Sequence, residues 1–273
     1  MTSLVIIEPG RKAKNYWADL WRYRELFQVL AWRDVAVRYK QTAIGIIWAI
    51  LRPFITMLVF TLIFGRLAKL PSDGNAPYSL LVLAGMLPWS FFSSSLAEAS
   101  FSLVMNSHLV SKVYFPRMIV PVSAIVVAFV DFIVGFVILL LMMLWFHYLP
   151  TWRVIYLPAF VALTFFASLG PVLWVSALNV KYRDFRYLIP FVVQFGLYIS
   201  PVGFSSNIVP PAWRLLYSLN PMAGVIDGFR WCLLDHTHLY WPGLLLSFAT
   251  TCLSTWWGAR QFRRLEGSFA DTI

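Results

Sequence analysis

The sequence predicts an all-α membrane protein with six transmembrane helices. Of its 273 residues, 60% are hydrophobic and only 12% are charged, and the mean hydropathy is +0.71. A soluble domain carries about 25% charged residues. A helix needs about 20 apolar residues to cross a hydrocarbon core about 30 Å thick. Apolar runs of roughly this length lie at residues 44–64, 80–103, 118–146, 155–178, 188–204 and 241–259.

The loops between these runs predict their orientation. Most of the 22 Lys and Arg residues precede the first span or follow the second, fourth and sixth spans. The side of a membrane protein that is rich in Lys and Arg is cytoplasmic, so we expect both termini in the cytosol. The net charge of +10 then reflects membrane topology. No module of basic and aromatic residues outside the spans favours nucleic acid as a partner.

We expect three regions: a cytosolic N-terminus at 1–43, a transmembrane domain at 44–260 and a cytosolic tail at 261–273. In the first region, apolar residues recur near helical spacing between charged ones, which predicts an amphipathic helix in the cytoplasmic interface of the membrane. A helix that packs on the protein's own loops remains the alternative. The recurring apolar residues are Trp17, Leu20, Trp21, Phe27, Leu30 and Val37.

The fifth span is followed by a segment of mixed character. Residues 205–240 are too polar and too rich in Pro to cross the membrane directly, yet they are more apolar than a free loop. Irregular backbone at membrane depth needs the cover of protein or of a water-filled cavity. We therefore expect short re-entrant helices, broken at Asn220-Pro221, with Asn220 as the cap of the second helix.

The segment from Asn106 to Arg117 lies between the second and third spans, on the predicted cytosolic side. It reads NSHLVSKVYFPR, so that five apolar residues stand beside Lys112 and Arg117. Such a segment is too apolar for a solvated connector. We interpret it as a handle for a cytosolic partner.

Arg52 is the one basic residue inside a predicted span. A long basic side chain near a helix end can snorkel to the membrane surface. The alternative is that Arg52 joins Arg38 and Lys40 at a lipid phosphate or at the entrance of a transport pathway.

Two acidic residues also lie within predicted spans, Glu98 in the second and Asp131 in the third. An ionisable group inside a membrane is costly and indicates a functional site by default. For Asp131, a hydrogen-bonding role between helices and a role in the transport pathway are equally favoured. Glu98, Asp131 and Asp227 fall at different predicted depths, so the sequence predicts no paired carboxylates.

Aromatic residues make up 18% of the chain. Interfacial belts and lipid contacts account for most aromatic residues of membrane helices. Aromatic faces also stack on the apolar faces of sugar rings, which suits weak, repeated contacts with a sliding polymer. The residues that we expect to line such a conduit, together with Asp131, are Trp89, Phe92, Trp174, Phe195 and Tyr198.

The sequence carries no motif for catalysis and no Gly-x-x-x-x-Gly-Lys-Ser/Thr loop for a nucleotide. Cys232 and Cys252 have no metal or disulfide spacing, so we expect them to fill apolar space. We expect no cofactor and no metal on this chain. Energy for transport must come from a partner or an ion gradient. Six helices make a thin wall for a polymer channel, which suggests a dimer.

Several segments, in their order and spacing, resemble a known family. They are Arg38-Tyr-Lys-Gln-Thr42, Gly85-Met-Leu-Pro-Trp89, Lys112-Val-Tyr-Phe-Pro-Arg117, Ser176-Ala-Leu-Asn-Val-Lys-Tyr-Arg-Asp184, Leu219-Asn-Pro-Met222 and Phe229-Arg-Trp231. The sequence resembles the permease subunits of bacterial ABC-2 type polysaccharide exporters, which move lipid-linked O-antigen, capsule and teichoic acid chains. It looks most like the O-antigen branch, and the resemblance covers nearly the whole chain.

The resemblance implies the ABC-2 (type V exporter) permease fold in the bacterial inner membrane. It implies a homodimer that pairs with two copies of a cytosolic ATPase, which holds the ATP and Mg, and that exports lipid-linked polysaccharide to the periplasm. Residues 106–117 would be the coupling helix that docks on the ATPase, and residues near 181–186 a second contact. The implied coupling residues are Ser107, His108, Leu109, Val110, Lys112, Val113, Tyr114, Phe115, Arg117, Arg183 and Asp184.

Two other functions compete with this interpretation. A related ABC-2 permease for capsule, teichoic acid, another lipid or a drug would share the fold, although the polysaccharide-like segments argue against a drug. A membrane enzyme acting on polyprenyl-linked sugars would need a cluster of charged groups at one membrane face.

Overall fold

The structure is a computed structural model that describes residues 16–40, 43–71, 76–182, 184–234 and 239–269. These residues form helices and no strand. The predicted all-α class is therefore confirmed.

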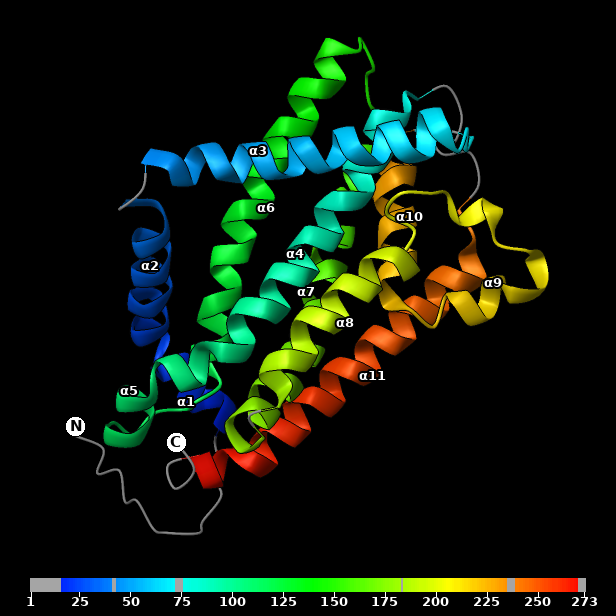
Figure 1. Ribbon diagram of the computed structural model, residues 1–273. Helices are drawn as coiled ribbons and strands as arrows, with labels where there is room; N and C mark the ends of the chain where they lie inside the picture. The colour runs from blue at the N-terminus through cyan, green and yellow to red at the C-terminus, as the bar shows by residue number, and fades with distance from the viewer. Residues whose placement is uncertain (1–15, 41–42, 72–75, 183, 235–238, 270–273) are drawn as a thin grey trace.

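The core is built around α4 (Tyr78–Met105), which packs against α6 (Ile119–Trp145) and α7 (Leu157–Lys181) (Figure 1). The first half of α4 is almost continuously buried, from Leu80 to Trp89. A helix that is apolar on all sides is one that neighbours surround. In addition to its contact with α4, α7 packs along α11 (Trp241–Leu265).

The α7–α11 contact is close because both helices carry small residues there. A Cβ atom added to Gly258 would lie 2.1 Å from the carbonyl oxygen of Gly170. Small residues let membrane helices approach at backbone distance. Buried hydroxyls in these helices bond to their own backbone, as Thr251 does to the Ser247 carbonyl at 2.8 Å.

Three helical segments are long and apolar enough to cross a membrane: Tyr78–Met105, Ile119–Trp145 and Trp152–Lys181, the last of which joins η2 (Trp152–Tyr156) to α7. Two further apolar helices are shorter, Pro53–Leu67 and Phe185–Ile199. The 25 residues of α11 are long enough, but its Ser, Thr and Trp residues lower its hydropathy. The count of six spans stays a prediction.

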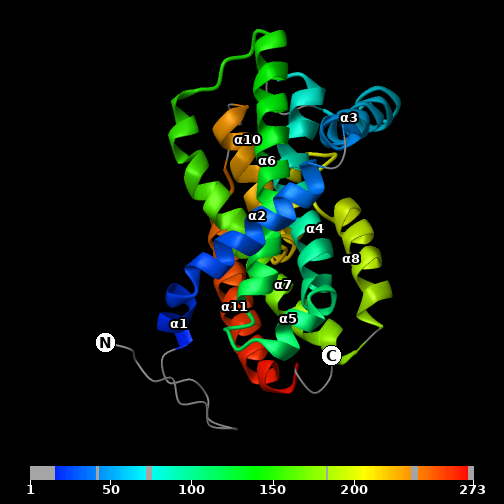
Figure 2. The same cartoon turned by 90° about the vertical axis from the view of Figure 1, so that its left-hand side faces the viewer.

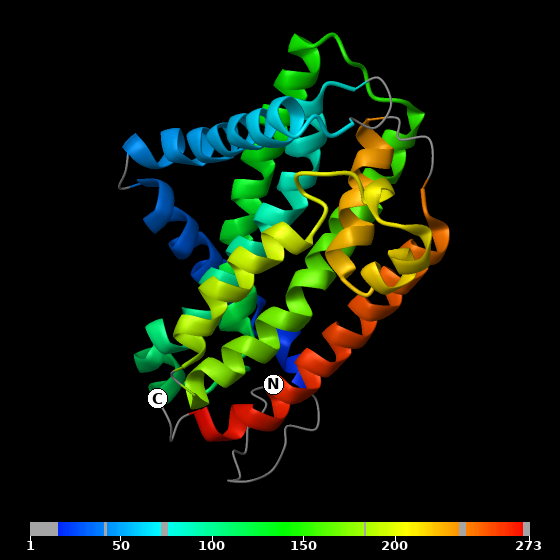
Figure 3. The same ribbon diagram turned by 45° about the vertical axis from the view of Figure 1, so that its right-hand side comes forward.

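The first predicted span forms α3 (Ala43–Phe60) and the π-helix η1 (Thr61–Leu67). This segment crosses the bundle instead of running along it (Figures 1 and 3). Among the side chains of this segment that the structure describes, Phe60 and Phe64 pack at Gly203, whereas Ile55, Leu58 and Val59 are exposed. The tilt of a membrane helix is set by its neighbours, so a sequence pattern predicts the helix but not its direction.

The N-terminal region forms α1 (Tyr16–Arg22) and α2 (Arg24–Lys40). The predicted helix is confirmed, with a break at Tyr23. One side of α2 packs on α6 (Figure 2). Trp17, Trp21 and Trp32 remain 62%, 73% and 75% exposed, so a location in the membrane interface stays a prediction.

The segment after α8 (Phe185–Ile199) is broken into short helices, namely η3 (Ser206–Ile208), α9 (Pro211–Tyr217) and α10 (Pro221–Leu233). The predicted cap is confirmed, because the Asn220 side-chain oxygen accepts a hydrogen bond from the Met222 amide at 3.0 Å. The fifth predicted span, 188–204, is wrong at its end. The helix stops at Ile199, where Ser200-Pro201 turns the chain.

Candidate functional site

The predicted handle forms a short helix, α5 (Ser107–Lys112), and a loop to α6. Val110 and Phe115 are 1% and 3% exposed and pack with residues of α6, α7 and α11. Between these anchors, Val113 and Tyr114 are 50% and 53% exposed. The segment is thus fixed from within and presents apolar side chains outward, a pattern typical of a docking surface.

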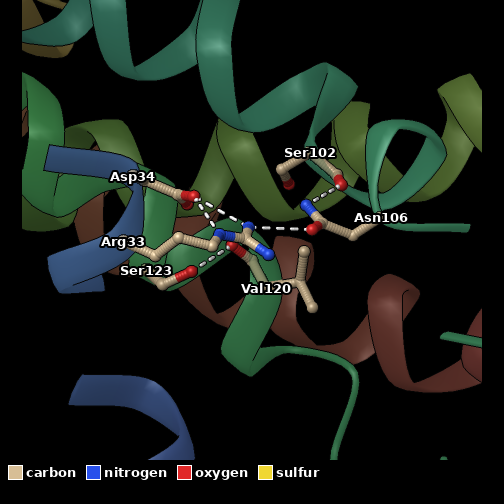
Figure 4. Close-up of polar contacts among 6 residues, drawn as sticks. All are labelled: Arg33, Asp34, Ser102, Asn106, Val120 and Ser123. Carbon is tan, nitrogen blue, oxygen red and sulfur yellow. Dashed lines mark hydrogen bonds and ion pairs between the residues drawn. The ribbon is translucent and has the colours of Figure 1, made fainter. Parts of the chain in front are cut away.

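Asn106 ties the start of this segment to α2 (Figure 4). Its amide nitrogen donates to the Ser102 carbonyl at 2.8 Å, and its amide oxygen accepts from the Arg33 guanidinium at 2.8 Å. Arg33 also forms an ion pair with Asp34 at 2.7 Å. In the same view, Ser123 donates to its own helix at Val120. Arg33 therefore links the start of this segment to α2.

Glu266 ties the end of the segment to α11, in the short helix η4 (Glu266–Ser268) that follows α11. The backbone amide of Arg117 donates to the Glu266 carboxylate at 2.7 Å, and the Arg117 guanidinium donates to the Glu266 carbonyl. The Tyr16 hydroxyl donates to the same carboxylate at 3.2 Å. Burial raises the pKa of Glu266, although the Arg117 amide and Tyr16 oppose the shift.

Arg38 joins α2 to two spans. Its guanidinium donates to Glu98 of α4 and pairs with Asp131 of α6 at 2.6 Å. The Tyr39 hydroxyl also donates to Asp131. The expectation that Glu98 and Asp131 lie at different depths is therefore wrong. The packing of α2 along α6 brings the Arg38 guanidinium to both carboxylates. The positions of Glu98 and Asp131 within their own spans do not predict this contact, because it depends on a third helix.

The contacts favour the structural role for Asp131, since both of its carboxylate oxygens have partners on α2. Lys40 is exposed at the end of α2. The side chain of Arg52 lies outside the described residues. The predicted roles of Arg38, Lys40 and Arg52 at a lipid phosphate or a pathway entrance stay predictions.

The second predicted contact, near residues 181–186, lies where α7 ends and α8 begins, at the same end of the molecule as α5 (Figure 1). Asp184 is exposed there, whereas Arg183 lies outside the described residues. Ser107, His108, Leu109 and Lys112 all belong to α5. The described residues for which a coupling role is predicted therefore lie at one end of the molecule, and that role stays a prediction.

The aromatic residues predicted to line a conduit differ in exposure: Trp89 and Phe92 are buried or partly buried, whereas Trp174, Phe195 and Tyr198 are exposed. Trp89 is buried, and its ring lies 2.6 Å from where a Cβ atom of Gly196 on α8 would stand; its ring centroid is 5.4 Å from that of Phe92. Phe195 and Tyr198 are 51% and 61% exposed on α8, and Trp174 of α7 is exposed as well. Among the described residues, no ring contact joins Trp174 to the other four.

Three residues have structural roles that the sequence did not predict: Arg33 and Glu266 at the coupling segment, and Arg230 at the turn after α8. Arg230 is a basic residue within an apolar helix, a signal that the sequence does contain. The contacts of Arg33 and Glu266 join segments 73 and 149 residues apart, and no local pattern predicts them.

The family model described as ABC-2 type transporter matches residues 25–234. The O-antigen export system permease protein RfbA of Myxococcus xanthus is 25% identical over 257 residues, which cover 93% of this chain and 98% of that protein. Two proteins of the same name from Klebsiella pneumoniae are 22% identical over 250 residues, 91% of this chain and 95% of theirs. Since the family model covers well over half of its residues, the chain belongs to the ABC-2 type transporter family.

Proposed function

We propose that this chain is the permease subunit of an ATP-driven exporter that moves lipid-linked polysaccharide, most closely O-antigen, from the cytoplasm to the periplasm. Its family and the relatives named as O-antigen export permeases support this function. The ATPase is a separate cytosolic protein present in two copies, and it binds the ATP and Mg. The permease itself carries out no catalysis and forms a homodimer in the bacterial inner membrane.

The coupling segment, residues 106–117, carries the proposal. Val113 and Tyr114 offer an apolar contact of the kind that a partner protein buries. Arg33 and Glu266 connect the two ends of the segment to α2 and α11. A push on this surface by the ATPase therefore reaches two helices at once.

The exposed face of α8 supports a channel between two copies. Gln194 and Tyr198 lie one helical turn apart on α8, and both are exposed. An uncovered polar amide is costly in lipid, so a water-filled channel or a second copy accounts better for this face. Phe191 and Phe195 lie beside it and supply surfaces on which sugar rings stack.

A double substitution in the coupling segment tests this function. Val113→Asp with Tyr114→Asp places two charges where the ATPase contact would be apolar, so we expect at least a tenfold loss of glycan export from cells that carry only this variant. The reconstituted permease and ATPase should still hydrolyse ATP, but without coupling to transport. Size-exclusion chromatography checks that the variant is folded.

Leu149→Asp with Thr151→Asp is the matched control. It adds the same two charges to the loop between α6 and η2, which lies at the opposite end of the molecule (Figure 1). Undiminished export by the Val113 and Tyr114 variant would reject the coupling segment as the ATPase contact.

The substrate is tested separately. Deletion of the gene for this chain should leave glycan synthesis intact, and lipid-linked glycan should accumulate inside the cell. Normal surface O-antigen in the deletion strain would exclude O-antigen as the cargo.

A further inference from the structure

A wide groove runs along the outside of the α7–α11 pair. Its volume is about 1740 Å³, whereas sites for small molecules measure roughly 300–1,000 Å³. Its walls are mainly apolar, and they include Leu163 and Phe166 of α7 and Phe248 and Cys252 of α11. The groove therefore has room for a molecule larger than a metabolite, with a long apolar part.

One end of this groove is basic. Arg260, Arg263 and Arg264 line it in the last turns of α11. Arg260 lies over the Trp256 ring at 5.1 Å and Arg263 over the Tyr16 ring at 4.7 Å. In the part of the chain that the structure describes, none of the ion pairs involves these three arginines.

The negative groups at the same end leave this positive charge in excess. The groove is also lined by Asp19 and Glu266, but the Glu266 carboxylate already accepts from the Arg117 amide and from Tyr16. The groove is thus complementary to an amphipathic molecule with an anionic headgroup at its basic end and an apolar tail along its walls.

The groove is longer than one leaflet of a membrane. Along α11 its lining runs from Leu244 to Arg264, a rise of about 30 Å, whereas the hydrocarbon of one leaflet is about 15 Å deep, half of the core thickness. The part from Phe248 to Arg260, about 18 Å long, is the part that one lipid of the leaflet beside the arginines would occupy. Arginines at the end of such a helix lie at the depth of lipid phosphates. One wall belongs to α7, which is long and apolar enough to cross a membrane, and the other to α11, the sixth predicted span. With both helices in the membrane, the medium beside the groove would be lipid.

We propose that this groove binds an anionic phospholipid of the leaflet that faces the chain termini. Its phosphate lies against Arg260, Arg263 and Arg264, and its acyl chains lie along Leu163, Phe166 and Phe248. Val113 and Tyr114 also line the basic end, so the bound headgroup borders the coupling segment.

Native mass spectrometry of the purified full-length chain tests this site. Phosphatidylglycerol, phosphatidylethanolamine and a polyprenyl phosphate are titrated in parallel. We expect phosphatidylglycerol to bind at least about tenfold more tightly than phosphatidylethanolamine. Arg260→Gln with Arg264→Gln should remove that preference, while Arg263 keeps its contact with Tyr16.

Lys181→Gln with Arg186→Gln is the control, since both residues are basic, exposed and outside the groove. Ala162→Phe is a second variant that leaves the charge unchanged and fills the groove from an exposed position on α7; it should weaken phosphatidylglycerol binding by a similar factor. Equal binding of phosphatidylglycerol to wild type and to both groove variants would overturn the proposal. So would preferential binding of the polyprenyl phosphate.

Discussion

Arg230 is the largest fully buried side chain among the described residues, and it lies in α10 near the end of the molecule opposite α5. Its guanidinium donates to the backbone carbonyls of Leu81, Val202 and Phe204 at 2.8 to 3.2 Å. A planar guanidinium offers five donors in a fixed fork, whereas an ammonium offers three on a flexible stem. This single side chain therefore holds the turn after α8 against α4.

Arg230→Lys should destabilise the fold although the charge is kept. The ammonium cannot reach three carbonyls in different directions, and each buried group left without a partner costs about 1–3 kcal/mol. For a chain of this size we expect the Tm in detergent to fall by at least 2–4 °C, the shift for about 1 kcal/mol.

The control for this prediction is Arg214→Lys. Arg214 also donates to two backbone carbonyls, those of Val209 and Asn207, but it is only partly buried on α9, so that water can replace a lost hydrogen bond and the substitution costs less. Equal Tm values for the two variants would contradict the role given to Arg230.

The stability of the contact at Glu266 should depend on pH. Burial raises the pKa of Glu266 above its value in the unfolded chain, so the folded state favours the protonated carboxyl. The stability that this preference supplies is fully present below the unfolded pKa of about 4.3 and is lost as the pH rises through the raised folded pKa.

Glu266→Gln isolates this effect, because the amide oxygen still accepts from Arg117 and Tyr16 but does not titrate. The Tm of the wild type should fall relative to that of the variant as the pH is raised from about 4 to 8. Parallel Tm curves over that range would show that Glu266 has the same pKa in both states.

At the scale of helices, local signals predict much and packing decides the rest. The cap at Asn220 and the break before Pro221 follow from two neighbouring residues, so the sequence predicts them correctly. Glu98 and Asp131 meet at Arg38 only because α2 lies along α6. The direction of α3 likewise depends on contacts with residues far away in the sequence, such as Gly203.

The α7–α11 pair gives a prediction at this scale. Gly258→Ala would place a methyl group 2.1 Å from the carbonyl oxygen of Gly170, and this backbone atom cannot turn aside as a side chain can. Forcing two packed helices apart costs about 1–3 kcal/mol, which exceeds the gain of about 1 kcal/mol in helix propensity from Gly to Ala. We expect a lower Tm for this variant.

Gly267→Ala is the comparison variant, since nothing lies within 4 Å of the added atom. It should not lower the Tm. If Gly258→Ala were as stable as Gly267→Ala, the two helices would have room that the structure does not show.

At the scale of the whole molecule, α4 links the two ends. Its first turns accept the Arg230 hydrogen bond at Leu81, and its last residue adjoins Asn106 of the coupling segment. Rigid helices are among the elements through which two distant sites can be coupled. The location and the apolar character of the coupling segment could be predicted from its sequence, whereas its ties to α2 and α11 are tertiary and could not.

The proposed homodimer is tested by cross-linking through α8. In a two-fold dimer the same surface of each copy meets the other, so a cysteine close to the axis pairs with its own equivalent. In a chain with Cys252→Ser, which removes the one exposed cysteine, we expect Phe195→Cys to form a disulfide-linked dimer when membranes are oxidised. Non-reducing electrophoresis measures the fraction of dimer.

Leu253→Cys provides the reference for random encounters. Leu253 is 65% exposed on α11 and is at least as accessible as Phe195, which is 51% exposed on α8. If α8 faces the second copy, Phe195→Cys should give at least about a tenfold higher dimer fraction than Leu253→Cys. Dimers from Leu253→Cys alone would contradict the α8 interface and would place the interface on α11. Gln194 and Tyr198 would then face lipid, and the cost of leaving their polar groups without partners there favours the α8 interface.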